Sequence, residues 1–135
     1  MKADDTALPR LPPTLLQGVA WVFRGPAFAD RAAFEAAVAE FQDPEWPSDW
    51  RPAEVILSAS RVRVEPDADW YDGEPVAGLA ADDGRAFTAG ELLFKVHNAF
   101  VAGLRRTNHQ FFEGFTLSAD PVAGEPPLYT LELGS

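Results

Sequence analysis

Three side chains in the C-terminal half of this sequence have types that suit acid–base chemistry: His97, His109 and Glu113. Histidine changes its charge near neutral pH. A carboxylate in apolar surroundings has a raised pKa, which a general acid or base can use. By alternation along TNHQFFEGF, Glu113 shares a strand face with Phe111 and Phe115. One hypothesis is therefore an enzyme or ligand-binding domain with these three side chains in a pocket between a sheet and a helix.

The same residues also have purely structural interpretations. His97 can be a buried histidine whose ring nitrogens bond to backbone or neighbouring side chains, and an inward Glu113 can pair with Arg61 or Arg63. His97 and His109 lack the four-residue spacing of a helical zinc pair, and the sequence has no HExxH, phosphate-binding loop, dinucleotide fingerprint or GxSxG. We therefore predict no metal, no cofactor and no catalytic residue.

Two loops combine large aromatic rings with acids, at residues 43–52 and 66–75. Exposed aromatics on irregular loops are typical anchors of protein interfaces, and surrounding acids suit a basic partner. Alternatively, the rings fold back to cover the open edges of a small core, whereas the acids cannot all do so. The candidate partner-binding residues are Trp46, Asp49, Trp50, Asp69, Trp70, Tyr71, Asp72 and Glu74.

Composition limits the function further. The 135 residues suit one domain, and 11 Lys and Arg against 21 Asp and Glu give a net charge of −10. This excess of acid argues against nucleic-acid binding, which needs clustered cations. There is no cysteine, and the N-terminus has neither a basic start nor an apolar run typical of a signal peptide. We expect a cytoplasmic protein that does not act at a membrane.

The candidate residues must be positioned by elements that the apolar periodicity predicts. A flexible arm over residues 1–13 precedes a single α+β domain over residues 14–135. Asp30 is the expected N-cap of a first helix, with an apolar stripe at Phe34, Ala37, Val38 and Phe41. The predicted strands cover residues 15–24, 53–65 (with a bulge near Ser60), 76–81, 111–118 and 128–133.

The segment at residues 87–106 predicts the central helix. Thr88 and Glu91 have capping-box spacing, and apolar residues recur after them every three or four positions. Glu91 falls on the polar side of this helix, and Arg105 and Arg106 lie at its expected C-terminal end, where cations suit the helix dipole.

This order predicts a βαββαβ plan with one further C-terminal strand. The first six elements match a ferredoxin-like topology, in which we expect an antiparallel sheet of about five strands with both helices on one face.

Three segments of the C-terminal half, FTAGELLFKVHNAF, NHQFFEGF and PPLYTLELGS, carry a resemblance. Together they resemble small bacterial immunity proteins encoded at polymorphic toxin loci, and the helix segment FADRAAFEAAVAEF adds to the likeness. The resemblance covers residues 87–135 and implies a protein that binds and neutralises a cognate toxin by occlusion. It transfers no catalytic residue.

The leading hypothesis is therefore an immunity-type binder of a basic toxin, and the alternative is the enzyme or ligand-binding domain described above. A third hypothesis is a homodimer that pairs through an exposed edge at residues 128–133.

Overall fold

The computed structural model describes residues 11–118, 120 and 122–135. Most of the predicted arm, residues 1–10, lies outside that part of the chain. Among the described residues the fold is α+β, as predicted, with two helices and two sheets. The elements in chain order are β1 (Thr14–Leu15), α1 (Arg31–Phe41), β2 (Val55–Leu57), β3 (Arg61–Pro66), β4 (Ala77–Ala80), β5 (Phe87–Thr88), α2 (Ala89–Phe100), β6 (Phe111–Leu117) and β7 (Leu128–Gly134).

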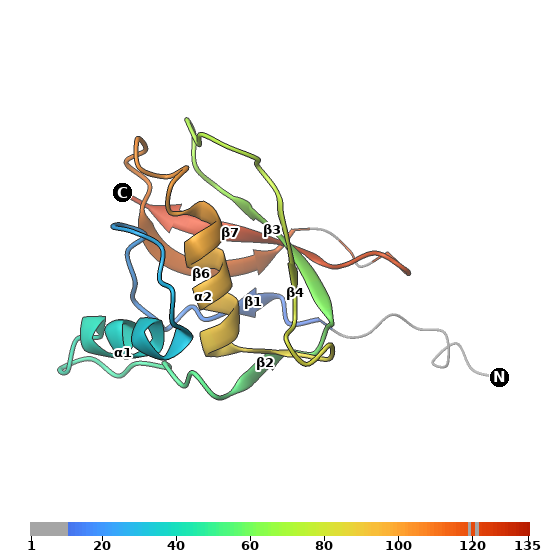
Figure 1. The fold of residues 1–135 in the computed structure, drawn as a ribbon, viewed down its shortest axis with the longest axis horizontal. Helices are drawn as coiled ribbons and strands as arrows, with labels where there is room; N and C mark the ends of the chain where they lie inside the picture. The colour runs from blue at the N-terminus through green and yellow to red at the C-terminus, as the bar shows by residue number, and fades with distance from the viewer. Residues whose placement is uncertain (1–10, 119, 121) are drawn as a thin grey trace.

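The larger sheet has five strands in the order β1-β6-β7-β3-β4, and β2 pairs with β5 in a separate two-stranded sheet (Figure 1). Strands β3 and β7 run parallel, whereas the other neighbours are antiparallel. The prediction of a wholly antiparallel sheet is therefore wrong. The ferredoxin-like β-α-β unit is also absent from the described chain, because β2 does not join the sheet that contains β1.

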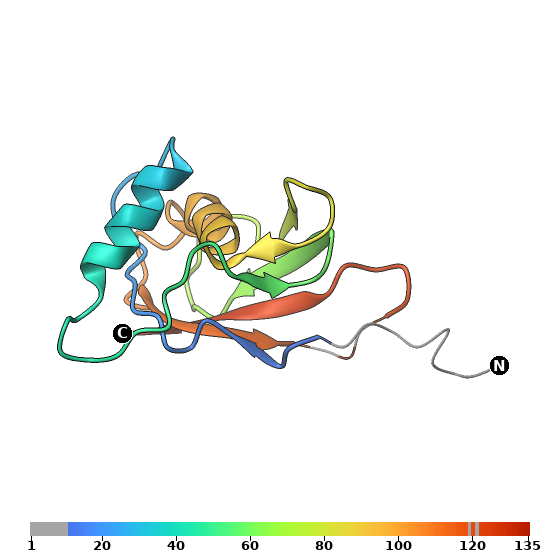
Figure 2. The ribbon, with the colours of Figure 1, turned by 90° about the horizontal axis from the view of Figure 1, so that it is seen from below.

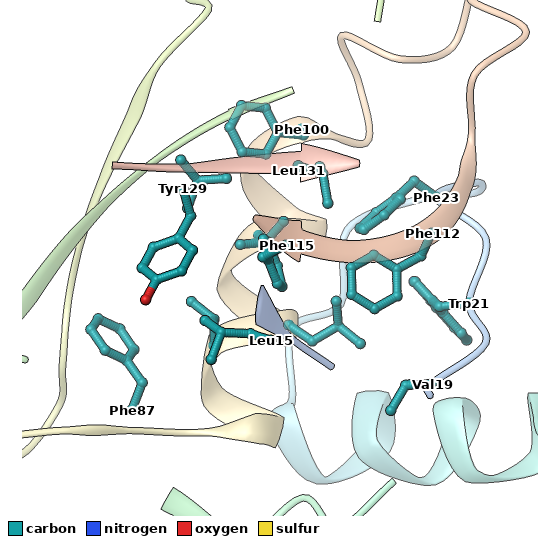
Figure 3. Close-up of a cluster of buried hydrophobic side chains, with 14 of the residues drawn as sticks. Leu15, Val19, Trp21, Phe23, Phe87, Phe100, Phe112, Phe115, Tyr129 and Leu131 are labelled. Atoms are coloured by element: carbon teal, nitrogen blue, oxygen red, sulfur yellow. The ribbon is translucent and has the colours of Figure 1, made fainter. Parts of the chain in front are cut away.

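The core lies between the five-stranded sheet and the elements on one side of it. Figure 2 shows both helices and the two-stranded sheet on that same side. Inward side chains of the sheet, including Phe115, Tyr129 and Leu131, meet Phe100 of α2 and Phe87 of β5 in one buried cluster (Figure 3). Burial of this apolar area is the main favourable contribution to folding. Neither helix is long and apolar enough to cross a bilayer.

The predicted strand at residues 53–65 is two strands in two sheets. Val55 lies on β2, which pairs with β5, and Val62 lies on β3, which pairs with β4 and β7. The change of apolar parity near Ser60 is real, but its cause is a passage between sheets and not a bulge within one strand.

A bulge does occur in β6, and it moves Glu113. The register shifts between Phe112 and Phe115, and Gly114 has φ 103°, in the left-handed region that favours glycine. Phe112 and Phe115 both face the core, whereas Phe111 and Glu113 are exposed. The predicted shared face of Glu113 with Phe115 is therefore wrong, because strict alternation does not hold across the bulge.

Helix α2 begins where the sequence predicts and ends earlier. The Thr88 hydroxyl accepts a hydrogen bond from the Glu91 N–H at 3.1 Å, which confirms the N-cap. Glu91 is buried and not on a solvent-exposed polar side: its carboxylate accepts from the Asp82 N–H at 2.7 Å and from Lys95 Nζ at 2.8 Å. The helix ends at Phe100, and residues 101–106 form turns, so the predicted extension to residue 106 is wrong.

The N-terminal part of the domain is extended but barely paired. Val19, Trp21 and Phe23 are buried, which confirms the predicted alternation, yet β1 contains only residues 14 and 15. Leu16 has φ 57°, which interrupts the strand, and the chain meets β6 again only at an isolated bridge between Val22 and Phe111. Just before β1, the Tyr129 hydroxyl donates to the Pro12 carbonyl at 2.7 Å, so the end of the predicted arm is tied to β7.

Candidate functional site

Among the large hydrophobic residues in the described part of the chain, Trp70 is the most exposed, with 85% of its surface accessible to solvent. It lies in the loop between β3 and β4, at residues 67–76, which we call the Trp70 loop. Its φ is 68°, a left-handed conformation that a bulky L-residue rarely adopts. Exposure of an indole and an unfavourable backbone conformation therefore coincide at one residue.

The base of the Trp70 loop is held firmly. The Asp67 N–H donates to the Leu131 carbonyl of β7 at 2.9 Å, and the Asp72 N–H donates to the Gly103 carbonyl at 3.0 Å. The Tyr71 ring packs edge-on against Phe100 with centroids 5.7 Å apart, and burial, then the nearby Asp72 carboxylate, raise the pKa of its hydroxyl. The loop is thus anchored on both sides of an exposed tip.

Gly103 makes this anchoring possible. A Cβ at position 103 would overlap the Tyr71 ring and would lie 2.6 Å from the Asp72 carbonyl oxygen. Only glycine allows the loop to approach the turn after α2 this closely. The sequence contains a signal for this contact, because a glycine within a predicted helix marks a break or a close contact. The predicted helix includes residue 103, whereas α2 ends at Phe100.

The Trp70 loop carries several exposed acids. Asp69, Asp72 and Glu74 are all exposed. Arg106 lines the same shallow depression as Trp70, Tyr71 and Asp72, so the rim is mixed in charge on the side of the turn after α2. The structure therefore places three of the predicted partner-binding residues, Trp70, Tyr71 and Asp72, on one depression, and it adds Arg106, which the sequence indicates only as a cation at a helix end. Asp69 and Glu74 lie in the same loop.

The second aromatic-acidic loop, residues 43–52, lies at a different end of the molecule (Figure 1). Trp46 is 72% exposed, and Asp49 is exposed beside Gly18. Trp50 instead folds back: its Nε1–H donates to the Glu35 carbonyl at 3.2 Å and its ring packs on the core. The structure does not combine the two loops into one surface, and Trp50 serves the core.

His97 is a structural histidine. It has no exposed surface, and it lies among the rings of Trp21, Phe23, Phe28 and Phe34. Trp21 Nε1–H donates to His97 Nδ1 at 3.2 Å, so the other ring nitrogen, Nε2, carries the proton and donates to the Pro26 carbonyl at 3.1 Å. Both nitrogens are satisfied in the neutral ring. Desolvation by burial lowers the pKa of His97, against the smaller opposing effect of the Pro26 hydrogen bond.

This burial predicts a pH dependence of stability. Because the pKa of His97 is lowered from its ordinary value of 6.5 on folding, the unfolded chain binds more protons than the folded chain just below that pH. The stability gained by keeping His97 neutral and buried should therefore be fully present in the free energy of unfolding above pH 6.5. It should be lost as the pH falls toward the pKa of His97 in the folded chain. Urea unfolding at several pH values measures the slope.

The comparison is between the parent chain and His97→Gln. This variant should flatten the slope below pH 6.5, whereas the parent chain should keep it. An unchanged slope in His97→Gln would contradict this assignment.

The His/Glu pocket does not form. His97 is sealed from solvent, whereas the exposed Glu113 carboxylate lies beside Gly134 at the end of β7. His109 lies in the turn before β6, with its N–H bonded to the Thr107 hydroxyl at 3.2 Å. Its Nδ1 is buried without a hydrogen-bond partner in the described chain. Arg63 pairs with Glu125 at 3.8 Å and not with Glu113.

A groove of about 420 Å³ lies elsewhere, between the β2–β3 turn and the β6–β7 loop, and its lining includes Ser60, Arg61, Val122 and Pro126. None of the predicted site residues lines it. The described residues contain no group of three or more His, Asp or Glu side chains placed to hold a metal ion. The Trp70 loop is therefore the strongest candidate site.

The edge proposed for homodimer formation is not an edge. β7, which contains residues 128–133, lies inside the sheet and pairs with both β6 and β3. The outermost strands of the larger sheet are β1 and β4.

Comparison of this chain with protein-family models, with curated proteins and with solved structures finds no match.

Proposed function

We propose that this chain is an immunity-type protein that binds a basic bacterial toxin and neutralises it by occlusion. One observation carries the proposal: Trp70 is 85% exposed and has φ 68°. A left-handed conformation of a bulky residue costs on the order of 1–3 kcal/mol, and such outliers cluster at binding sites. A partner that covers the indole would recover the free energy of burying its apolar surface.

The surroundings of Trp70 support a protein partner. Tryptophan is among the residues that most often dominate interface energetics, especially where neighbouring contacts exclude water. The anchored base of the Trp70 loop restricts the backbone on both sides of Trp70, which reduces the conformational entropy lost on binding. The open, shallow shape around Trp70 fits a protein surface better than a small molecule, which binds in a concave pocket.

The charge of the chain supports a basic partner. A net charge of −10 creates a long-range attraction that speeds the encounter with a cationic protein. The exposed acids Asp69, Asp72 and Glu74 concentrate that attraction at Trp70. Fast capture is useful to an inhibitor that must act before its toxin does.

Growth rescue tests the proposal directly. The product of the reading frame next to this gene is expressed in a bacterial host, alone and together with this chain. We expect growth arrest without the chain, growth with it, and co-purification of the two proteins. A toxic neighbour that is not relieved by this chain, or a neighbour without toxicity, would contradict the proposal.

A further inference from the structure

Strand β4 begins directly after the Trp70 loop and forms an outer edge of the five-stranded sheet. The Trp70 loop therefore continues directly into a strand that has a neighbour on only one side. An edge strand presents backbone N–H and C=O groups to which another chain can pair. The question is which of these groups point outward on β4 and what could reach them.

Two hydrogen bonds fix the direction of the β4 backbone. The Ala81 N–H donates to the Ser60 carbonyl at 2.8 Å, so Ala81 points toward the chain that enters β3. In an antiparallel pair the direction of the backbone groups alternates from residue to residue. The N–H and C=O groups of Ala77 and Leu79 therefore point toward β3, and those of Gly78 and Ala80 point away from it. Lys95 Nζ agrees with this, because it reaches the outward Ala80 carbonyl at 2.6 Å.

The outward groups are accessible at Gly78. This residue is exposed, and a Cβ built on it would have no atom within 4 Å. Its N–H and C=O, together with the Ala80 N–H, are three backbone groups directed away from β3. Glycine places no side chain in the path of an approaching strand. Lys95 limits the open stretch at its far end by occupying the Ala80 carbonyl.

The charges around β4 indicate which kind of strand would pair with its edge. From residue 72 to residue 85 the chain contains four acids and one base, Arg85. Asp72 and Glu74 lie before β4, and Asp83 lies after it, all exposed. An antiparallel second copy paired through Gly78 would bring Glu74 of each chain to the 82–83 turn of the other chain. Asp82 in that turn already pairs with Lys95 and Arg31. Asp83 has no such ion pair within the described chain, and its charge opposes the approach of Glu74. A strand with cations near both ends meets opposite charge instead.

The geometry points to a strand-addition site: an extended segment of the basic partner pairs with β4 through Gly78 and Ala80 while another part of the partner covers Trp70. This inference rests on the proposed function, and it adds the mode of recognition. Backbone pairing supplies affinity in such complexes, and flanking side-chain contacts supply specificity.

A peptide tests the edge without the toxin. The probe has about ten residues of alternating Thr and Val, enough for a strand, with two lysines at each end. Its control has glutamates in place of the lysines. An NMR titration of the whole chain should show shifts of the Gly78 and Ala80 amides and slowed exchange of their protons at about 1 mM basic peptide, corresponding to weak binding. The acidic peptide should leave both amides unchanged.

Two variants at one position sharpen the test. Gly78→Pro removes the outward N–H and leaves the β3 pairing of Ala77 and Leu79 intact, because proline is tolerated on a sheet edge. Gly78→Ala keeps the N–H and meets no atom within 4 Å. We expect Gly78→Pro to weaken peptide binding about tenfold or more and Gly78→Ala to bind within about twofold of the parent.

The outcomes separate this inference from the proposed function. Absence of shifts at Gly78 with the basic peptide, or equal shifts with the acidic one, overturns strand addition whatever the growth assay shows. Concentration-dependent shifts of Gly78 without peptide, with a doubled mass in solution, also overturn it and assign the edge to a second copy. If Gly78→Pro still rescues growth whereas Trp70→Ala does not, the proposed function stands, and pairing of a partner strand with β4 is excluded.

Discussion

Trp70→Ala is expected to weaken binding of the proposed toxin partner about 30- to 700-fold, which corresponds to about 2–4 kcal/mol for a hot-spot tryptophan. The reason is that Trp70, at 85% exposed, buries little of its surface in the free protein and has a large apolar area to bury in a complex. Stability should hardly change, because substitutions of exposed side chains alter it by about 0.5 kcal/mol or less. Isothermal titration calorimetry and urea unfolding measure the two quantities separately.

Trp46→Ala is the matched control for this change. Trp46 is also a highly exposed tryptophan in an acidic loop. That loop, residues 43–52, lies at another end of the molecule (Figure 1). If the Trp70 loop forms the interface, Trp46→Ala should bind within about threefold of the parent, as peripheral substitutions commonly do. The reverse pattern, with affinity lost in Trp46→Ala and kept in Trp70→Ala, would transfer the interface to residues 43–52.

Phe34→Ala is expected to lower the free energy of unfolding by about 3–5 kcal/mol, the range for a buried phenylalanine replaced by alanine. Phe34 has no exposed surface, and its ring meets Trp21 at 5.2 Å, Phe28 at 5.2 Å and His97 at 5.4 Å between centroids. The substitution leaves a cavity in the aromatic cluster around His97. A domain of this size has about 5–15 kcal/mol of stability in total, so the variant should unfold far more readily.

Phe41 provides the comparison on the same helix. Its ring also contacts Trp21, with centroids 5.5 Å apart, but 42% of the residue is exposed. Phe41→Ala should therefore cost clearly less than Phe34→Ala when both are measured by urea unfolding. Equal losses would mean that α1 is held by its C-terminal end and not by the His97 cluster.

Local signals predicted most of the elements. The Asp30 and Thr88 caps lie where side-chain chemistry placed them: each side chain accepts a hydrogen bond from the first turn of its helix. Period-two alternation also identified the buried residues Tyr129, Leu131 and Leu133 of β7. These features depend on neighbours within four residues, and therefore a single sequence contains them.

Long-range pairing was not predictable in the same way. Nothing local distinguishes β2 from β3, because Val55 and Val62 have equal strand propensity and differ only in the partners they find. The parallel pairing of β3 with β7 joins segments more than sixty residues apart. Prediction by alternation also fails within one strand. Gly114 has a positive φ at the bulge in β6, so Glu113 lies on the face opposite to the one that alternation predicts.

Composition indicates two candidate loops, and exposure in the structure distinguishes Trp70 of one loop from Trp50 of the other. Exposed Trp70 and partly buried Trp50 both lie in loops rich in acid and proline, and the sequence pattern of the two loops is alike. What separates them is the hydrogen bond from Trp50 to the Glu35 carbonyl, a contact with the neighbouring helix that no local pattern encodes. The anchoring role of Gly103 likewise depends on a contact with Tyr71, thirty-two positions away.

That close contact between Gly103 and Tyr71 divides the loop into a part that folding requires and a part that it does not. Tyr71 and Asp72 are tied to the turn after α2, whereas Asp69 and Trp70 contribute little to the packed interior. Substitutions at the tip can therefore accumulate without unfolding the protein, while those at the anchor cannot. Under the proposed function, such a division would let the tip change its target preference over generations while the scaffold stays folded, and it marks the tip as the place to randomise when new targets are selected in the laboratory.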